Sequence, residues 1–303
     1  MFDVLAIAAA MTVVLAADQW PRDTSLYRGR TDLVTVGVTV VGKQHQLVTD
    51  LTANDFAVYE DGVAQQIFAF ASGTEPGPSL HIGVLLDVSG SQGLDLQFTR
   101  SAVIKFLKSL PDPVDDVTFI DFATNVRSGR YSQGDFTRLY KRVRDLTAGG
   151  ETALYDALGL YLDGAQDQNG RKLMVLYTDG ADTVSGLSLD TLMTLLKASD
   201  VTVYAIGALD NQPQMEQSTL RALLADIAAA TGGAVFFPSS AKQLDRIYDQ
   251  VLGEVRAQYT IGYVSTNQRT DGAWRKVDIK ITGADNRPLH VRARKGYYGP
   301  SSP

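Results

Sequence analysis

The sequence predicts an α/β domain with a doubly wound, mostly parallel sheet, inserted into a β-sandwich that both ends of the chain build together. Between residues 80 and 258, short apolar runs alternate with amphipathic helical segments, which is the pattern of parallel strands joined by crossover helices. On either side of this region, apolar residues recur at every second position, as in strands with one buried face. Neither flank has enough strands to close a core alone, so we expect the two flanks to share one sandwich.

The first 17 residues are typical of a secretory signal peptide, because an apolar run from Val4 to Ala17 is followed by small residues. Asp3 stands where a signal peptide usually has basic residues, which leaves an uncleaved anchor or a misassigned start as alternatives. The run is shorter than the about 20 apolar residues that span a membrane. The chain has no cysteine, so neither disulfides nor a lipid-bearing cysteine is available. We expect a secreted, periplasmic or cell-surface protein whose mature chain has no membrane span.

The segment 31–72 is the expected N-terminal part of the sandwich. It begins with a predicted strand in which four valines face a core and the residues between them face out: Val34, Val36, Val38 and Val40 alternate with Thr35, Gly37 and Thr39. Asp61 and Gly62 then predict a tight hairpin turn between the strands 56–59 and 63–70. Residues 73–79 contain Gly and Pro and are predicted to form a linker.

The segment 80–257 is the expected α/β domain. Its predicted strands are 81–87, 116–122, 172–178, 201–207 and 234–237, with an edge strand near 125–131. Its predicted helices are 94–109, 135–146, 152–164, 188–199, 217–230 and 241–257. The last helix has apolar residues at helical spacing and is expected to lay one face on the sheet. His81 begins the first strand and is expected to be a buried structural histidine.

The segment 258–298 is the expected C-terminal part of the sandwich, with strands at 258–264, 274–282 and 288–294. A short basic cluster near its end is expected to cover the solvent face of a strand; it consists of Arg292, Arg294 and Lys295. The formal net charge is −6 and no basic stripe runs along the chain, so nucleic acid is not the expected partner.

Three oxygen-bearing residues follow the first strand of the α/β domain. Asp87 is the last residue of that strand, and Ser89 and Ser91 come directly after it. Open α/β sheets bind ligands beyond the carboxyl ends of their strands, which is where these side chains are expected to lie. Oxygen ligands without His or Cys suit a hard cation such as Mg²⁺ or Ca²⁺ better than Zn²⁺.

Two later segments each supply one more oxygen at the same edge. Thr152 follows two glycines at the start of a helix, and Asp179 ends the strand 172–178. Together these segments resemble the von Willebrand factor A domain with its metal-ion-dependent adhesion site. The five-residue pattern of that family falls on Asp87, Ser89, Ser91, Thr152 and Asp179, with no member missing. The resemblance covers roughly residues 80–258, and the flanks resemble those of the bacterial secreted branch of the family.

The resemblance implies a non-enzymatic binding or adhesion module that holds a divalent cation at these five residues. Two carboxylates balance the charge of the ion and three hydroxyls add none, so the metal keeps its affinity for another anionic oxygen. We expect Mg²⁺, with Mn²⁺ or Ca²⁺ as alternatives, and a protein partner that offers Asp or Glu to the metal. The competing structural interpretation is that the hydroxyls cap helices and the carboxylates merely end strands. Asp182 is expected to be a turn residue that supports the site and does not bind the ion.

A hydrolase is the alternative function at the same strand end. The sequence around Ser91 nearly matches a nucleophile elbow, and Ser91, Asp179 and His290 follow one another in hydrolase order. However, Ser89 replaces the first glycine of that motif, and His290 lies on a strand of the expected sandwich. Asp87 acting as a nucleophile over Mg²⁺ would need a second carboxylate two residues later, where Ser89 stands.

Overall fold

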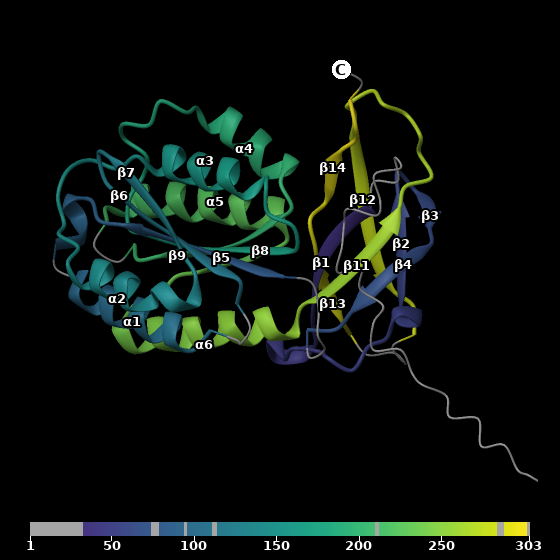
Figure 1. Ribbon diagram of the computed structural model, residues 1–303, viewed down its shortest axis with the longest axis horizontal. Coiled ribbons are helices and arrows are strands. Elements are labelled where there is room, and N and C mark those ends of the chain that lie inside the picture. Colours follow the sequence, from purple (N-terminus) through teal and green to yellow (C-terminus); the bar gives the residue numbers. More distant parts are fainter. Residues whose placement is uncertain are drawn as a thin grey trace, which may run out of the picture.

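A computed structural model describes residues 33–73, 79–93, 96–110, 114–209, 212–283 and 288–301. Figure 1 shows two bodies side by side, a layered α/β domain and a sandwich of antiparallel strands. The expected signal peptide, residues 1–17, lies outside the described residues, and so do residues 74–78 of the expected linker.

The α/β domain is built on a six-stranded sheet in the order β10-β9-β8-β5-β6-β7. Its strands are β5 (Leu80–Asp87), β6 (Asp116–Phe122), β7 (Val126–Tyr131), β8 (Arg171–Thr178), β9 (Val201–Gly207) and β10 (Ala234–Phe236). All neighbouring strands are parallel except β7, which runs antiparallel to β6 at the edge. Every residue of β5 is buried, as expected for a central strand covered on both faces. The predicted, mostly parallel sheet is confirmed.

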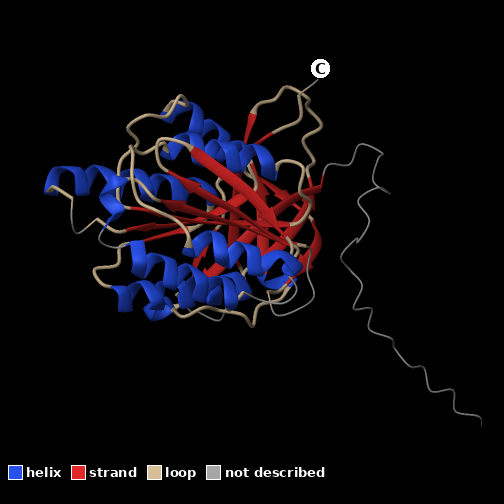
Figure 2. Cartoon of the chain, turned by 60° about the vertical axis from the view of Figure 1, so that its left-hand side comes forward, coloured by secondary structure: helices blue, strands red, loops and turns tan. Residues whose placement is uncertain are grey.

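Helices cover both faces of this sheet, as Figure 2 shows. They are α1 (Leu96–Lys108), α2 (Phe136–Arg144), α3 (Leu154–Ala165), α4 (Leu189–Ala198), α5 (Gln214–Thr231) and α6 (Ala241–Ala257). One hydrophobic core joins the sheet to α1, α2 and α6, and a second core joins it to α3, α4 and α5. The apolar face of α6 is buried, as its spacing predicts. Within the described ranges, no helix combines the length and hydrophobicity needed to cross a membrane.

Strands from both ends of the chain form the sandwich. One sheet has the order β13-β1-β11-β4 and the other has the order β14-β12-β2-β3. The strands are β1 (Leu33–Val41), β2 (Phe56–Glu60), β3 (Val63–Gln65), β4 (Ile67–Ala71), β11 (Tyr259–Val264), β12 (Trp274–Ile281), β13 (His290–Arg292) and β14 (Gly296–Tyr298). The N-terminal β1 pairs with the C-terminal β11, and β2 pairs with β12, around one hydrophobic core. The predicted shared sandwich is therefore confirmed.

Short 3₁₀ turns at Lys43–His45, Ala53–Asp55, Gly90–Gly93 and Gln133–Asp135 complete the described elements. The predicted hairpin turn is present: Glu60 pairs with Val63, and both Asp61 and Gly62 have positive φ, of 48° and 83°. Positive φ at both central residues is the geometry that a two-residue hairpin turn requires, which explains the Asp-Gly sequence.

The strand predicted at 63–70 is wrong in one respect, because the chain breaks it and changes sheets. β3 pairs with β2 in one sheet, whereas β4 pairs with β11 in the other. At the break, the buried Gln65 side chain donates to Thr266 Oγ1 and accepts from Thr266 N, at 2.9 Å and 3.0 Å. A strand that switches sheets forms a corner of a sandwich without any Gly or Pro, so the apolar pattern continues through it. The edge strand β14 was not among the predicted strands.

The residues of β1 that were predicted to face out are covered by neighbouring parts of the chain, so this prediction of an outward face is wrong. Thr39 is 1% exposed, and a Cβ placed on Gly37 would lie 3.0 Å from the Gln258 side chain. Thr35 and Gly37 line a small cavity with Arg171 and other residues at the amino ends of β8 and β9. The sandwich thus packs against the amino ends of the parallel strands.

The predicted solvent exposure of the basic cluster is also wrong for two of its three members. Arg292 forms an ion pair with the buried Glu254 of α6. Arg294 donates to the carbonyl oxygens of Thr35 at 2.8 Å and Ser199 at 3.3 Å, and burial lowers the pKa of its guanidinium. Lys295 is exposed. The two arginines bind the sandwich to the α/β domain, and the carboxyl ends of the parallel strands lie at the opposite edge.

Candidate metal site

The site is built from loops that follow β5 and β8 and from the loop that precedes α3. Val88 O accepts from Gly149 N at 2.9 Å, and Gly150 O accepts from Gly90 N at 2.9 Å. These two hydrogen bonds fasten the loop after β5 to the loop before α3. Gly150 has a φ of 85°, and a Cβ there would lie 2.6 Å from Thr124 Oγ1, so both the conformation and the space require glycine.

Asp87 is the most deeply buried member of the site, with 0% of its surface exposed. Its Oδ1 accepts from Ser89 N at 2.9 Å, and its Oδ2 accepts from Thr178 Oγ1 at 2.7 Å. Burial raises the pKa of this carboxyl group, and the hydrogen bonds from Ser89 and Thr178 oppose that rise. Across the described ranges, no Lys, Arg or His side chain forms an ion pair with Asp87. A bound cation would stabilise this buried negative charge.

Ser89, Ser91 and Asp179 form a chain of oxygens beside Asp87. Ser91 Oγ donates to Asp179 Oδ1 at 2.8 Å and lies 3.2 Å from Ser89 Oγ. Ser89 and Asp179 are buried, whereas Ser91 is exposed and opens the group to solvent. The edge that the sequence predicted therefore does bring these three side chains together.

Thr152 reaches the same place from the start of α3. It is 6% exposed, and a Cβ placed on Gly180 would lie 3.5 Å from Thr152 Oγ1. Its backbone is held by the loop after β8, because its N donates to Thr183 Oγ1 at 2.9 Å and its O accepts from Thr183 N at 2.8 Å. The N-cap of α3 is Ala153, and the side chains that accept from the first-turn amides of this helix are Asp182 and Ser185, not Thr152. Thr152 is thus not the helix cap that the competing interpretation needs.

Sequence reasoning missed two residues that hold the site in shape. Thr178 is 0% exposed, and besides its bond to Asp87 its Oγ1 accepts from Gly180 N at 3.2 Å. Gln212 Nε2 donates to Asp179 O at 2.7 Å and so fixes the loop after β8. A threonine at the carboxyl end of a buried strand, directly before Asp179, is a signal that points to Thr178, whereas nothing in the local sequence marks Gln212. Asp182 accepts from Tyr155 N at 3.1 Å, as expected for a supporting turn residue.

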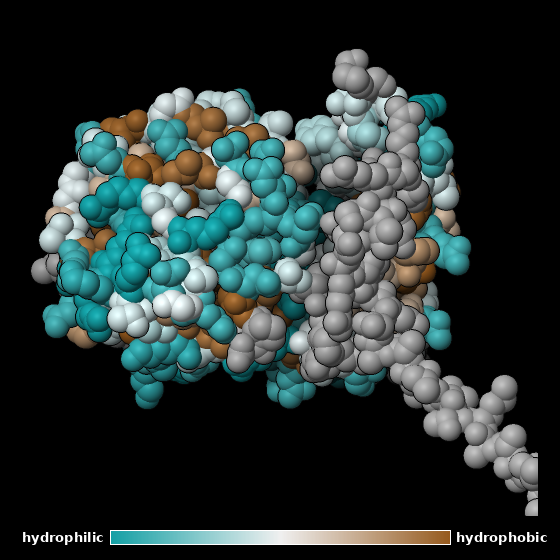
Figure 3. Space-filling view, viewed as in Figure 1, coloured by the Kyte–Doolittle hydropathy of each residue, from teal (hydrophilic) through white to brown (hydrophobic). Residues whose placement is uncertain are grey.

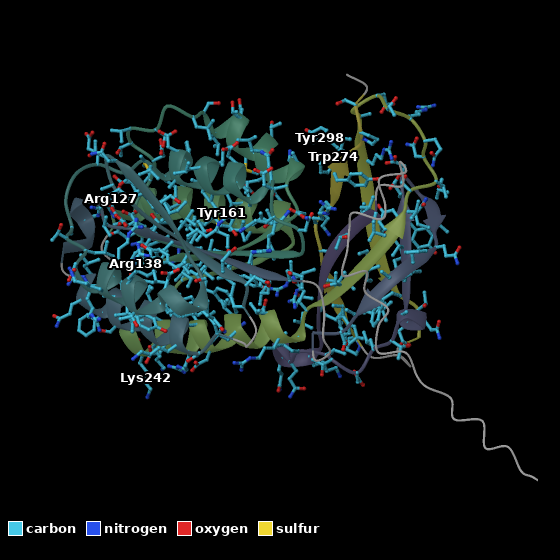
Figure 4. The ribbon with its side chains drawn as sticks, in the orientation of Figure 1. Arg127, Arg138, Tyr161, Lys242, Trp274 and Tyr298 are labelled. Atoms are coloured by element: carbon cyan, nitrogen blue, oxygen red, sulfur yellow. The ribbon has the colours of Figure 1, made fainter. Side chains whose placement is uncertain are left out.

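The hydrolase arrangement does not form. His290 lies on β13, which pairs with β1 in the sandwich, at the amino ends of the parallel strands. Ser91 lies beyond the carboxyl end of β5, and a strand of eight residues spans about 26 Å. Figure 4 shows the two ends of the molecule. Arg127, which pairs with Asp121 beside the carboxyl end of β6, lies at one end, and Trp274 lies in the sandwich. Ser91 and His290 are therefore too far apart to form the hydrogen bond that a nucleophile and its base require.

The donor set fits a hard cation. The described residues contain no group of three or more His, Cys, Asp and Glu side chains placed to hold a metal ion, and the candidate site offers two carboxylates and three hydroxyls. All five donors are oxygens, which Mg²⁺, Mn²⁺ and Ca²⁺ prefer. The chemistry of the donor set therefore suits a divalent cation that is bound by few protein carboxylates.

A family model described as the von Willebrand factor type A domain matches residues 81–250. Among curated proteins, none matches the chain. Solved structures with the same fold include the pilus adhesin SpaC from Lactobacillus rhamnosus GG in its open conformation, at 13% identity and a TM-score of 0.52. That match covers 84% of this chain and 49% of the adhesin.

Two further solved structures are similar at lower TM-scores. A von Willebrand factor type A protein from Catenulispora acidiphila is 12% identical with a TM-score of 0.49, over 89% of this chain and 74% of that one. The proximal thread matrix protein 1 of the mussel byssus, with a zinc-occupied MIDAS motif, is 17% identical with a TM-score of 0.47. This last match covers 64% of this chain and 49% of the mussel protein.

Proposed function

The chain belongs to the von Willebrand factor type A domain family, and from this premise we propose that it is a non-enzymatic module that binds a protein partner through a divalent cation. Members of this family usually mediate metal-dependent adhesion. The observation that carries the proposal is the buried Asp87, which has two hydrogen-bond donors, no ion pair among the described residues, and the Ser89, Ser91 and Asp179 oxygens beside it.

The residues that would hold the ion are Asp87, Ser89, Ser91, Thr152 and Asp179. A bound ion supplies a site for an anionic oxygen. The side chains of this chain would hold the cation in place, and because they include only two carboxylates they would leave it a residual affinity for another one. We propose Mg²⁺ as the ion, with Mn²⁺ or Ca²⁺ as alternatives, since Mg²⁺ keeps exchangeable ligands when the protein offers few carboxylates.

The partner that fits this chemistry is a protein that places an Asp or Glu carboxylate on the metal. Ser91 is the exposed member of the site, so a partner would reach the metal from the solvent beyond the carboxyl ends of β5 and β8. Nucleic acid does not fit as a partner, because the net charge of −6 gives no attraction to phosphates.

An extracellular role agrees with this proposal. One structural neighbour is a pilus adhesin. We propose that the chain is secreted, periplasmic or on the cell surface, with residues 1–17 as its signal peptide. The mature chain would then contain the sandwich, from 31–72 and 258–298, and the inserted domain 80–257.

Calorimetric titration of the whole chain with Mg²⁺, Mn²⁺ and Ca²⁺ tests the proposal. Wild type is expected to bind one ion, and Asp179→Ala is expected to lose binding while its circular dichroism spectrum stays native. Asp190→Ala removes an exposed carboxylate in the first turn of α4 and serves as the control for lost charge. Equal binding by wild type and Asp179→Ala would refute the proposed site.

A further inference from the structure

Exposed apolar side chains gather at the edge of the α/β domain that holds the candidate site. Helices α1, α4 and α5 each follow a parallel strand, so their first turns lie at the carboxyl edge of the sheet. Phe98 in the first turn of α1 is 58% exposed, and Met215 in the first turn of α5 is 82% exposed. Leu189, the first residue of α4, is 37% exposed.

These side chains are not scattered over the domain. The described residues of the α/β domain include four large hydrophobic side chains of this exposure, namely Phe98, Leu160, Leu189 and Met215. Leu160 lies within α3, away from its ends, and the other three lie in first helical turns at one edge. On the face drawn in Figure 3, hydrophobic residues of this domain lie as separate patches between hydrophilic ones. Single exposed apolar residues are ordinary, whereas a group around a polar centre is typical of a binding surface.

Hydrogen bonds connect the helix that carries Met215 to the site, and a short segment of chain connects the helix that carries Phe98 to it. Gln217 Nε2 donates to Gln212 O at 2.9 Å, and Gln212 in turn donates to Asp179 O at 2.7 Å. The first turn of α5, which carries Met215, is therefore fixed to the loop of Asp179. On the other side, α1 begins at Leu96, shortly after Ser91, and Phe98 is in its first turn.

The charges around the site limit what else a partner can carry. Glu151 stands next to Thr152 and is exposed, and Glu216 stands next to Met215 and is exposed. With a divalent ion balanced by two carboxylates, one more carboxylate is attracted to the metal, and further acidic side chains meet like charges at the rim. Repulsion of this kind disfavours polyacidic partners.

We propose that Phe98 and Met215 form an apolar rim of the metal site, and that this rim selects a protein segment in which a single Asp or Glu lies beside large apolar side chains. The inference rests on the proposed function, because the carboxylate is held by the metal. Aromatic side chains at the centre of an interface carry much of its binding energy, and the flexible thioether of methionine adapts to varied apolar surfaces.

Selection from a displayed library of seven-residue peptides with a fixed central Asp tests the inference on the whole chain. Binding is carried out in Mg²⁺ and elution is with EDTA. The selected peptides are expected to carry a large apolar residue beside the Asp and no further acidic residue. Phe98→Ser and Met215→Ser are each expected to weaken the best peptide at least tenfold. Phe68→Ser is the matched control, because Phe68 is 60% exposed on β4 of the sandwich, and it should leave the affinity unchanged.

Methionine methyl NMR supplies a readout that does not depend on variants. The Met215 methyl signal is expected to shift when the best peptide is added in Mg²⁺ and to return when EDTA is added. Met174 is 0% exposed in β8 and serves as the internal control, with an unchanged signal.

The failures of the two proposals can be distinguished. Peptides that elute with EDTA but carry acidic runs or no apolar preference, and that bind Phe98→Ser normally, would overturn the rim and leave the proposed function standing. If no peptide binds in a metal-dependent way, the proposed function is refuted, and the proposed apolar rim is refuted with it. Self-association of the chain that Phe98→Ser abolishes would identify a second copy as the occupant and would also overturn the inference.

Discussion

Thr178→Val tests whether a residue behind the site tunes its affinity for metal. Thr178 Oγ1 donates to Asp87 Oδ2 at 2.7 Å and also contacts Gly180 N and Gly180 O at 3.2 Å each. Valine has nearly the same shape, so at 0% exposure the variant removes a hydroxyl and leaves no cavity. What is lost is the hydrogen bond that orients one oxygen of a buried carboxylate, together with the weaker bond that Gly180 N donates to the same hydroxyl.

The expected effect on metal affinity follows from the loss of the hydrogen bond to Asp87. Hydrogen bonds to charged groups contribute about 1.5–3 kcal/mol, and changes in groups that orient metal ligands weaken binding by about 10–100-fold. Thr178→Val should therefore raise the Kd for Mg²⁺ by about 10–100-fold, which corresponds to about 1.4–2.7 kcal/mol. Thr178→Ser keeps the hydroxyl and should remain within about threefold of wild type on the same scale.

Calorimetry measures the affinity, and urea unfolding monitored by circular dichroism shows whether each variant is folded. A folded Thr178→Val variant that binds Mg²⁺ as tightly as wild type would refute the reasoning, because Asp87 would then bind no metal or would need no orientation. A Thr178→Ser variant as weak as Thr178→Val would assign the effect to packing.

Three further predictions concern the frame around the site, and urea unfolding measures each. Gly83→Ala should lower the free energy of unfolding by about 1–3 kcal/mol, because its Cβ would lie 2.3 Å from a buried tyrosine ring; unchanged stability would contradict this packing. The hydrogen bond to Asp116 is the main reason that the pKa of His81 is raised above 6.5. The stability that the protonated His81 contributes is therefore complete below pH 6.5 and is lost as the pH rises through the folded-state pKa. His81→Asn should flatten this pH dependence of the unfolding free energy, and an equal dependence in both proteins would refute the prediction. Arg292→Met should cost about 3 kcal/mol because the 2%-exposed Glu254 loses its ion-pair partner, and a neutral effect would show that this pair does not hold the two bodies together.

The sequence predicts the fold well where one face of an element is apolar and the other is polar. The alternating valines of β1 and the spacing of α6 identify both elements and their buried faces. The same alternation cannot distinguish solvent from a polar junction between two bodies. Arg294 was predicted to face water for this reason, although it donates to backbone carbonyls of β1 and of the segment after α4.

Four residues of the candidate site were predictable from one geometric rule, because Asp87, Ser89, Ser91 and Asp179 lie at or directly after the carboxyl ends of parallel strands, whereas Thr152 was identified by the resemblance to the family pattern. Gln212 follows no such rule: its amide reaches Asp179 from a loop after β9, and only the packed chain shows the contact. The point after Gln65 at which the chain passes from one sheet to the other could not be predicted from the sequence for a similar reason. Side-chain hydrogen bonds take the place of the turn residues that usually mark such a break.

Anomalous scattering from crystals grown with Mn²⁺ would locate the ion. We expect an anomalous peak among the oxygens of Asp87, Ser89, Ser91, Thr152 and Asp179, and we expect Mg²⁺ in excess to remove it. A peak elsewhere, or no peak at this edge while these side chains are ordered, would contradict the account.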